Sequence, residues 1–492
     1  MIVYINYNNK LDIQNTLNIS RISTGLPGLD SLIEGGIPKG FTVIVVGNPG
    51  TGKTTLCSQF IYDGLATKDE NGVYISFSES KTQFYANAER LGMDFNKFER
   101  LMKFTFLALP SLTKDGIQDA LEEILATIGD TKAKRVVLDS FSAISLAFED
   151  QSEARTTVQV LLGKIMRSEG ITSMLVLEVP YGKRSIGSGL EESVVDGIIH
   201  LKNKEDNTSP IILRVLKMRG TAITREPHIC TIGNNGMILY PKQSLRLTYR
   251  ASEERIISGI PGFDERISNG FIRGTTTAVI GAAGTAKSTF AFQYIAEGVR
   301  KNGEAGIFCT LEQSADEIRI MGKSYGYDMI QLEKDGLSIL ATSAEDQNPD
   351  AFIVNLASEI KRTKAKRLVI DSLSAFTHKY KNEIYTITRR IVSLIQEYQI
   401  TAIVTILTTQ RIGFEVTGLE LSSLLQNVIL LRFVEVKGRM TRILLVLKTR
   451  ESQHDESILE FKISKDKGGV EITGPIDKEY IGLSTGMAQK VE

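Results

Sequence analysis

Short apolar runs and amphipathic stretches alternate along the chain, and each kind has its own period. Runs rich in Val, Ile and Leu predict buried strands, whereas apolar residues three or four positions apart predict helices with one buried face. Near-continuous apolar strands that alternate with helices are typical of a parallel sheet covered on both faces. One helical pattern runs through Ile117, Leu121, Ile124, Leu125 and Ile128. The predicted strands of the first half are 42–47, 73–77, 135–139, 171–178, 197–201 and 211–216.

A glycine-rich segment interrupts this pattern in each half, directly after a predicted strand. It reads GNPGTGKT from Gly47 and GAAGTAKS from Gly281. Both segments fit the Walker A pattern, in which successive backbone N–H groups converge on phosphate oxygens and a lysine reaches the outer phosphates. The sequence therefore predicts two ATP sites. Their nucleotide-binding residues are Gly50, Thr51, Gly52, Lys53, Thr54 and Thr55 in the first half, and Gly284, Thr285, Ala286, Lys287, Ser288 and Thr289 in the second.

An aspartate ends one apolar strand downstream of each glycine-rich segment. Asp139 closes the run RVVLD, and Asp371 closes the run RLVID. An aspartate in that position commonly caps a turn, but a phosphate loop upstream in both copies favours a Walker B role. A carboxylate next to the hydroxyl of the loop suits Mg²⁺. The predicted metal ligands are Thr54 and Asp139 in the first site, and Ser288 and Asp371 in the second.

The two halves repeat each other at nearly constant spacing. Lys53 and Lys287 are 234 positions apart, and Asp139 and Asp371 are 232 positions apart. A repeat this long exceeds the ~20–50-residue periods of solenoids and indicates duplication of a whole domain. The sequence thus predicts an α/β chain of two tandem P-loop ATPase domains, each a mainly parallel sheet flanked by helices. The predicted division is a polar leader (1–18), domain one (19–248), domain two (249–473) and a mobile tail (474–492).

The composition of the chain mainly excludes certain partners and locations. The 492 residues include 58 basic residues (Lys and Arg) and 58 acidic residues (Asp and Glu), so the formal net charge is zero. A neutral chain argues against nucleic acid as a partner. No apolar run approaches the ~20 residues of a membrane span, and polar residues at 6–10 interrupt any signal peptide. We therefore expect a cytoplasmic protein with no membrane partner. The cysteines, expected to be buried and reduced, are Cys57, Cys230 and Cys309.

Charged residues also occur in each half at places that suit phosphoryl transfer. Glu79 and Glu312 follow the strands after the first helix of each half, where a carboxylate can orient water or accept a hydroxyl proton. The alternative is an ordinary solvated glutamate at a strand end. Each half has in addition a Lys-x-Arg pair in a late strand, namely Lys217 with Arg219 and Lys448 with Arg450.

Together these motifs resemble the KaiC family of RecA/DnaB-type ATPases, over nearly all of the chain except its leader and tail. The resemblance is carried by the segments 256–264 (IISGIPGFD), 370–375 (IDSLSA), 428–435 (VILLRFVE) and 216–221 (LKMRGT). It implies two RecA-like domains per chain, stacked as a double-ring homohexamer with ATP between neighbouring subunits. It also implies ATP hydrolysis in the first ring, and phosphorylation of the protein's own Ser and Thr side chains in the second.

The resemblance gives roles to the Lys-x-Arg pairs and to one histidine. Both pairs match family positions that reach a neighbour's γ-phosphate, where cations supplied in trans stabilise the developing charge. The alternative for both pairs is a solvated face of a strand. His454 matches a further contact of domain two, and Ile223 takes that place in domain one. The resemblance therefore implies two unequal sites.

The chain departs from the family at the glutamates and at one loop position. The family places two adjacent glutamates after the second strand of each domain. This chain has Ser78 before Glu79, and it has Gln313 after Glu312. By that alignment domain two keeps the base, and domain one is expected to hydrolyse ATP slowly or through a shifted water. Ala286 stands where the family commonly has Gly, and we expect its Cβ to be tolerated there with a negative φ.

The same alignment places Ser422 and Ser423 on the family's phosphorylated Ser-Thr pair, with Thr417 as a third hydroxyl nearby. Domain one has Glu191 and Glu192 at the corresponding place, so the hydroxyl pair belongs to domain two alone. Transfer requires a hydroxyl about 3–3.5 Å from a neighbour's γ-phosphate, with a base at hand. The alternative is that two serines on a partly buried helix bond only to backbone carbonyls.

Three functions are compatible with these residues. The first is a regulatory ATPase and self-kinase whose conformation or phosphorylation is read by partners. The second is a strand-exchange protein or DNA motor, because recombinases and ring helicases share the fold; a neutral chain without a basic arm argues against it. The third is a scaffold in which ATP mainly holds a ring together. Salt-dependent DNA binding separates the second function from the others, and turnover separates the first from the third.

Overall fold

A computed structural model describes most of the chain. The described residues are 19–109, 116–141, 170–179, 195–203, 211–242, 252–343, 348–377, 379–408, 421–436, 438–476, 480–481 and 489–490. The chain divides into two compact units between Lys242 and Gln243. A tandem arrangement follows, with one glycine-rich loop in each unit.

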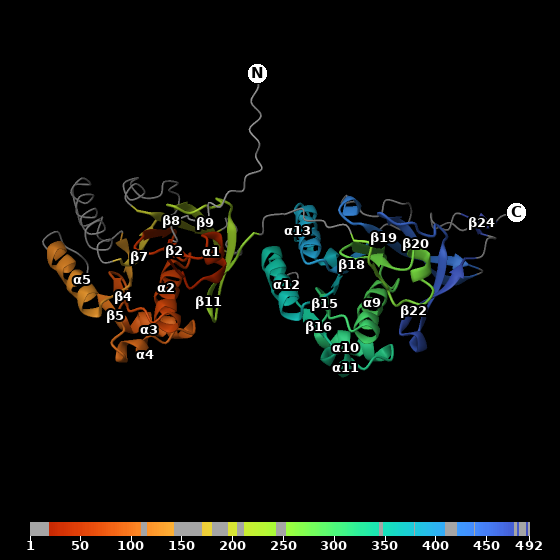
Figure 1. Ribbon diagram of the computed structural model, residues 1–492, viewed down its shortest axis with the longest axis horizontal. Helices are drawn as coiled ribbons and strands as arrows, with labels where there is room; N and C mark the ends of the chain where they lie inside the picture. Colours follow the sequence, from red (N-terminus) through yellow and green to blue (C-terminus); the bar gives the residue numbers. More distant parts are fainter. Residues whose placement is uncertain are drawn as a thin grey trace, which may run out of the picture. The chain divides into compact units, whose positions relative to one another are not determined.

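The first unit opens with a strand pair around a short helix and continues as an alternation of strands and helices (Figure 1). Its helices are α1 (Pro27–Leu32), α2 (Lys53–Thr67), α3 (Lys81–Arg90), α4 (Phe95–Arg100) and α5 (Ile117–Thr131). Its strands are β1 (Arg21–Ile22), β2 (Ile37–Pro38), β3 (Thr42–Gly47), β4 (Gly72–Ser76), β5 (Phe104–Ala108), β6 (Arg135–Asp139), β7 (Thr172–Glu178), β8 (Gly197–Asn203), β9 (Ile211–Met218), β10 (His228–Gly233) and β11 (Gly236–Tyr240).

The second unit repeats this order. Its helices are η3 (Asp264–Ile267), α9 (Lys287–Asn302), α10 (Ala315–Ser324), α11 (Met329–Lys334), α12 (Pro349–Thr363), η4 (Leu373–Phe376), α13 (Ile384–Glu397), η5 (Leu421–Ser423) and η6 (Lys465–Lys467). Its strands are β12 (Arg255–Ile256), β13 (Phe271–Ile272), β14 (Thr276–Gly281), β15 (Gly306–Thr310), β16 (Leu337–Ala341), β17 (Arg367–Asp371), β18 (Thr401–Leu407), β19 (Asn427–Val436), β20 (Arg439–Thr449), β21 (Leu459–Ser464), β22 (Gly469–Pro475), β23 (Tyr480–Ile481) and β24 (Gln489–Lys490).

Each unit is built on one mixed sheet, and the two sheets have the same topology. Among the described residues, the first sheet has nine strands in the order β11-β10-β9-β8-β3-β7-β6-β4-β5. The strands from β8 to β5 pair in parallel, and β9, β10 and β11 extend the sheet in antiparallel fashion. The second sheet has the equivalent order β22-β21-β20-β19-β14-β18-β17-β15-β16. The glycine-rich loop thus leaves a central strand in both units, β3 in the first and β14 in the second.

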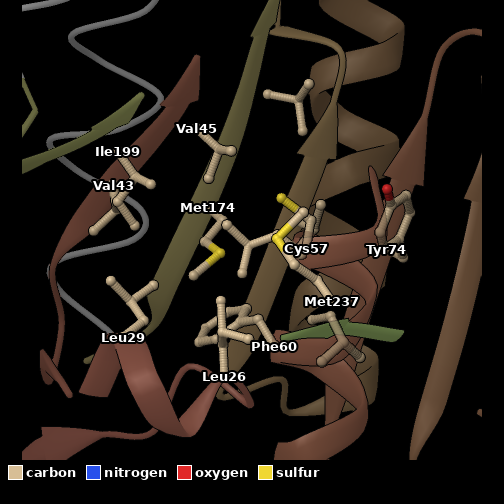
Figure 2. Close-up of a cluster of buried hydrophobic side chains, with 14 of the residues drawn as sticks. Leu26, Leu29, Val43, Val45, Cys57, Phe60, Tyr74, Met174, Ile199 and Met237 are labelled. Carbon is tan, nitrogen blue, oxygen red and sulfur yellow. The ribbon is translucent and has the colours of Figure 1, made fainter. Parts of the chain in front are cut away.

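Helices cover both faces of each sheet, as the apolar strands predict. In the first unit α2, α3 and α4 pack on one face, where Leu56, Phe84 and Phe95 share a core with β3. Helix α5 packs on the other face through Ile124 and Ile128. In the second unit α9 to α11 take one face, and α12 and α13 take the other. Figure 2 shows the first of these cores, with strand residues Val43 and Val45 and helix residues Cys57 and Phe60.

A fully buried arginine ties the helix after each loop to the strand that ends in the aspartate. Arg135 Nε donates to Glu70 Oε2 at 2.7 Å, and its Nη1 donates to the carbonyl of Phe60 in α2 at 2.6 Å. Arg367 Nε donates in the same way to Glu304 Oε2 at 2.6 Å. A buried guanidinium needs such partners because its desolvation is unfavourable. The two arginines therefore fix the loop helix against the aspartate strand.

A glycine in the last third of each loop helix makes room for this arginine. A Cβ at Gly64 would lie 2.4 Å from Arg135 Nε, and a Cβ at Gly298 would lie 2.1 Å from Arg367 Nε. Glycine normally weakens a helix interior. Its presence in both helices follows from the close approach of the guanidinium.

Most of the sequence-based expectations for the first unit are confirmed. The six predicted strands correspond to β3, β4, β6, β7, β8 and β9, with ends that differ by two residues or fewer. Strand β5 has no predicted counterpart, because its short run alternates between buried and half-buried positions at the sheet edge. The three cysteines are buried free thiols, as expected.

Some expectations fall outside the described residues. These are the leader at 1–18, Thr417, Glu191 and Glu192. Within the described ranges, no helix is both long enough and apolar enough to cross a membrane.

Candidate nucleotide sites

Each glycine-rich loop turns between a central strand and a helix, from β3 to α2 and from β14 to α9. Two residues in each loop have a left-handed φ. Such residues let backbone N–H groups curve around an anion at the helix N-terminus. The φ angles are +78° at Gly50, +81° at Gly52, +78° at Gly284 and +74° at Ala286.

The expected negative φ at Ala286 is wrong. With a φ of +74°, Ala286 caps α9 in the same left-handed conformation that Gly52 adopts at the start of α2. The loop imposes this conformation because the chain must turn there to enter the helix. For a residue with a Cβ it costs about 1–2 kcal/mol. At Gly52 a Cβ would also lie 2.6 Å from the terminal carbons of Ile232 and Met237, so an alanine in the first loop requires these two side chains to move.

The loop lysines are buried and bonded to their own loops. Lys53 Nζ donates to the carbonyl of Asn48 at 2.9 Å, and Lys287 Nζ donates to the carbonyl of Ala282 at 2.8 Å. The threonine two positions before each lysine donates to the same carbonyl at 2.8 Å. Burial, opposed in part by nearby carboxylates, lowers the pKa of both lysine amines. An anion bound in the loop would therefore interact with a lysine ammonium group that is largely shielded from water.

Each strand aspartate accepts a hydrogen bond from a buried hydroxyl of a neighbouring strand, and that neighbouring strand differs between the two units. Asp139 Oδ2 accepts from Thr54 Oγ1 at 2.7 Å and from Tyr74 OH at 2.7 Å. Asp371 Oδ1 accepts from Thr405 Oγ1, in β18. Both carboxylates are 7% exposed. The structure thus brings the Walker A hydroxyl and the Walker B carboxylate together in the first unit.

The chemistry of these donors fits Mg²⁺. Hydroxyl and carboxylate oxygens are the ligands that this cation takes, usually with water and phosphate oxygens completing the shell. In the first unit the hydroxyl of Thr54 and the carboxylate of Asp139 already lie within one hydrogen bond of each other. In the second unit Ser288 and Asp371 hold the equivalent places, at the start of α9 and the end of β17.

The two candidate bases follow equivalent strands, yet their hydrogen bonds differ. Glu79 is half-buried and accepts from Asn87 Nδ2 of helix α3 at 2.7 Å. Burial raises the pKa of Glu79, and this hydrogen bond opposes the shift. Glu312 is exposed and accepts from Ser372 Oγ at 3.3 Å, next to Asp371. Glu312 is therefore held against the aspartate strand, and Glu79 against a helix.

Both Lys-x-Arg pairs lie at the end of the sheet away from their own phosphate loop. Backbone hydrogen bonds link Arg219 through Asp196 to Thr42, the first residue of β3. Backbone bonds link Arg450 in the same way to Thr276, the first residue of β14. Each loop follows the last residue of its strand, roughly 17 Å farther along. The pairs are thus not brought to the phosphate loops of their own units.

The candidate phosphate acceptors lie beside the second Lys-x-Arg pair. Ser422 and Ser423 belong to η5, just before β19. Ser423 is exposed, and its carbonyl accepts from Arg450 Nη2 at 2.8 Å. Lys448 Nζ donates to the carbonyl of Leu425 at 2.9 Å. Burial, together with the charge of Arg450, lowers the pKa of Lys448.

The remaining predicted groups are also tied to their own strands. Lys217 Nζ donates to a backbone carbonyl at 2.8 Å, and Arg219 Nη1 lies 3.2 Å from Asp196 Oδ1. His454 Nδ1 is 2.9 Å from the hydroxyl of Thr449, the residue between the lysine and the arginine of the second pair. These contacts hold both pairs at the same edge of their units.

A carboxylate that the sequence did not single out lies at the first phosphate loop. Glu178 ends β7 opposite Gly47, and its Oε1 is 3.8 Å from Lys53 Nζ. The last residue of the equivalent strand β18 is Leu407, which is 46% exposed. In the sequence, a charged residue directly after an apolar run was the signal that could have identified Glu178. The first site therefore has a further acidic group, where the second has an apolar one.

A cavity of about 530 Å³ lies beside the loop helix of the second unit. Tyr325 forms part of its wall, and the hydroxyl of Tyr325 is 2.9 Å from Thr289 Oγ1. Lys465 and Lys467 line the same cavity. The wall of this cavity therefore combines tyrosine rings with charged side chains. No periodic pattern in the sequence indicates this cavity.

These features define a class of protein. A glycine-rich loop between a parallel strand and a helix, beside an aspartate that ends a neighbouring strand, is a P-loop ATPase core. The chain contains two such cores in RecA-like sheets, and it is therefore a tandem P-loop ATPase.

Comparison with known proteins gives the family. A family described as "ATPase: KaiC" matches the chain twice, at residues 22–244 and 256–476. The chain belongs to this KaiC ATPase family. The chain is 31% identical over 478 residues to the circadian clock oscillator protein KaiC of Rippkaea orientalis, covering 94% of this chain and 90% of that protein.

Two relatives from Synechocystis show similar likeness. The circadian clock oscillator protein KaiC 1 is 31% identical over 479 residues, covering 94% of this chain and 91% of the relative. The circadian clock protein KaiC3 is 30% identical over 492 residues, covering 96% and 95%. The likeness spans both units, so the chain is a KaiC-type ATPase with tandem nucleotide-binding domains.

Proposed function

We propose that this KaiC-type ATPase works as a homohexameric ring in which one subunit holds ATP and Mg²⁺ and the next subunit completes the site. The observation that carries the proposal is the position of the Lys-x-Arg pairs, at the sheet end opposite their own phosphate loops. A ring made by head-to-tail contacts joins unlike ends of neighbouring subunits. The cations of one subunit then reach the phosphates held by another.

Both phosphate loops have the same task in this proposal. Its backbone N–H groups and its buried lysine, Lys53 or Lys287, bind the phosphates. Thr54 with Asp139, and Ser288 with Asp371, hold Mg²⁺, which when bound offsets the phosphate charge. Arginines from the neighbour stabilise the charge that develops during transfer. The remaining predicted loop residues extend the same cradle.

The second unit also transfers phosphate to the protein's own serines in this proposal. Ser423 is exposed and bonded through its carbonyl to Arg450, so the cation that would reach a neighbour's phosphate carries this serine with it. A new bond forms between the serine Oγ and the γ-phosphorus, and the bond to the bridging oxygen of ADP breaks. The hydroxyl proton passes to the carboxylate of the neighbour's Glu312.

A regulatory role is favoured over a DNA motor. The chain has zero net charge, and electrostatic attraction to phosphate backbones is the main non-specific term in DNA binding. The named relatives are circadian clock proteins, which supports an ATPase whose product is a state of the protein itself.

Assembly provides the test of the ring. Light scattering at micromolar protein should give the mass of a hexamer with ATP and Mg²⁺, and a smaller mass without nucleotide, because ligand shared between subunits stabilises the assembly by mass action. An Arg219→Ala/Arg450→Ala variant should need more ATP to assemble. A monomer at saturating ATP and Mg²⁺ would rule out the ring.

Incubation with labelled ATP tests the kinase step. Label should map to the peptide that contains Ser422 and Ser423, and a Ser422→Ala/Ser423→Ala variant should lose it. Undiminished label in that variant, or no label in the unaltered protein, would leave an ATPase without self-phosphorylation. Nucleotide retained without turnover would indicate a scaffold held together by ATP.

A further inference from the structure

The two Walker B aspartates are oriented by different buried hydroxyls. Tyr74 OH donates to Asp139 Oδ2 at 2.7 Å, and Thr405 Oγ1 donates to Asp371 Oδ1. Tyr74 and Thr405 are both fully buried. Each aspartate thus has a buried hydroxyl donor in a neighbouring strand of its sheet.

The donors approach from opposite sides of the aspartate strand. In the first sheet β6 lies between β4, which carries Tyr74, and β7. In the second sheet β17 lies between β15 and β18, which carries Thr405. The donor therefore comes from the strand nearer the sheet edge in the first unit, and from the strand nearer the phosphate loop in the second.

The register shows that the two donors have exchanged places with apolar residues. Gly72 pairs with Arg135, and Gly306 pairs with Arg367, so Tyr74 corresponds to Phe308. Thr172 pairs with Arg135, and Thr401 pairs with Arg367. The fifth residues of these two strands correspond, so Thr405 takes the place of Val176. Each unit thus has one hydroxyl and one apolar side chain in these two positions.

Burial gives this exchange a physical reason. A carboxylate that is 7% exposed has lost most of its contact with water and needs hydrogen-bond donors from the protein, and a fixed donor also fixes the rotamer of the aspartate. In Figure 2 the Tyr74 ring lies in the core and its hydroxyl points toward the arrowhead ends of the strands, where β6 ends in Asp139. The ring itself packs on Phe84 at 4.5 Å between centroids.

We propose that Tyr74 and Thr405 are equivalent positioning residues that aim each Walker B carboxylate at Mg²⁺. This inference rests on the proposed metal role of Asp139 and Asp371. In the first unit the oxygen that accepts from Tyr74, Asp139 Oδ2, also accepts from Thr54 Oγ1 of the loop helix, so the tyrosine hydroxyl holds the carboxylate in the orientation that faces the phosphate loop. One donor per site is enough, and either neighbouring strand can supply it.

The test measures Mg²⁺ dependence of nucleotide binding at one site. In a Lys287→Ala background, only the first site binds a fluorescent ATP analogue, and its retention is titrated with Mg²⁺. Tyr74→Phe should raise the Mg²⁺ midpoint about tenfold, since a lost hydrogen bond to a charged group has at least that effect. The change keeps the ring and its packing.

Exchange variants supply the readout that a packing role would not give. Adding Val176→Thr to Tyr74→Phe gives the first unit the arrangement of the second, and it should restore the midpoint. In a Lys53→Ala background, Thr405→Val should raise the midpoint of the second site, and Phe308→Tyr should restore it. In the same Lys53→Ala background Tyr294→Phe is the control for the second site, because Tyr294 is equally buried in that unit and its hydroxyl donates to the carbonyl of Thr401 instead of to Asp371.

The outcomes separate this inference from the proposed function. Normal Mg²⁺ dependence in the unaltered site, with no shift in Tyr74→Phe, overturns the inference alone. A first-site shift that Val176→Thr does not reverse, or a second-site shift in Tyr294→Phe equal to that in Thr405→Val, assigns these hydroxyls to packing and overturns it as well. Nucleotide binding that needs no Mg²⁺ in the unaltered protein overturns the metal role and the inference together.

Discussion

The two nucleotide sites share one backbone but differ in the groups around it. Both loops turn through left-handed residues, and both lysines donate to a loop carbonyl. Around this frame, Glu178 lies near the first lysine, whereas Leu407 holds the equivalent place in the second unit. The two units thus share the loop geometry that we expect to bind phosphate, and they differ in the charged groups around it.

The hydrogen bonds of the two candidate bases differ most. Glu312 accepts a hydrogen bond from Ser372, next to the Walker B aspartate, and Glu79 accepts one from Asn87 in a helix. A base must lie within hydrogen-bond reach of the proton it takes. The comparison indicates two sites of similar affinity and unequal rate.

Removing the loop lysines tests the shared part of the comparison and should have the largest effect. Lys53→Ala should lower the affinity of the first site for ATP about 100-fold and leave the second unchanged, and Lys287→Ala should do the reverse. Equilibrium binding of labelled ATP measures this. Fewer than two nucleotides per unaltered chain at saturation would contradict the claim of two sites.

The glutamates sharpen the contrast in rate. Glu312→Gln should reduce phosphoryl transfer in the second unit about 100-fold, because it removes the proton acceptor. Glu79→Gln should reduce hydrolysis in the first unit by less than about tenfold, since this carboxylate is tied to helix α3. Single-turnover rates in the Lys53→Ala and Lys287→Ala backgrounds isolate the two sites. Equal losses would show that the bases are assigned wrongly.

The glycines next to the buried arginines test whether the loop helix packs equally closely against the arginine in the two units. Gly64→Ala and Gly298→Ala should each destabilise their own unit by about 1–3 kcal/mol, because the new Cβ meets the guanidinium. Gly129→Ala is the control: a Cβ at this position in α5 meets nothing within 4 Å, and the change should stabilise by about 0.5–1 kcal/mol. Urea unfolding measures all three. A neutral Gly298→Ala would mean that the arginine moves aside.

The smallest effect is expected at the loop position where the units differ by one methyl group. Ala286→Gly should stabilise the second unit by about 1 kcal/mol or less, because it removes left-handed strain but frees the unfolded chain. Gly52→Ala should destabilise the first unit by more, through strain and the contacts with Ile232 and Met237. Thermal unfolding compares the two. A destabilised Ala286→Gly would show that the methyl group packs usefully.

The strands, helices and phosphate loops could be predicted from the sequence because apolar periodicity and glycine spacing are local signals. Strand β6 and helix α5 can be predicted from their own residues alone. The left-handed φ of Ala286 could not be, since it is set by the path of the loop and not by alanine's own preference. Register decides which hydroxyl faces an aspartate, so the exchange of Tyr74 for Thr405 became visible only in the folded sheet.

The Lys-x-Arg pairs illustrate the same limit. Their spacing was visible, but their distance from the phosphate loop depends on the antiparallel pairing of β8 with β9 and of β19 with β20. That pairing returns the chain to the amino end of the central strand. Only then does a role in a neighbouring subunit have a structural reason.

Mixing two defective subunits tests most directly whether ATP sites are completed by a neighbour. Lys53→Ala subunits lack a working first loop but keep Arg219, and Arg219→Ala subunits have the opposite defect. When the two are mixed at equal amounts before assembly with ATP, about a quarter of the first-ring interfaces join an intact loop to an intact arginine. First-site turnover should then exceed the average of the separate variants. A Lys53→Ala/Arg219→Ala partner should give no gain. If the first mixture also gives no gain, each site is complete within one chain and the central claim is wrong.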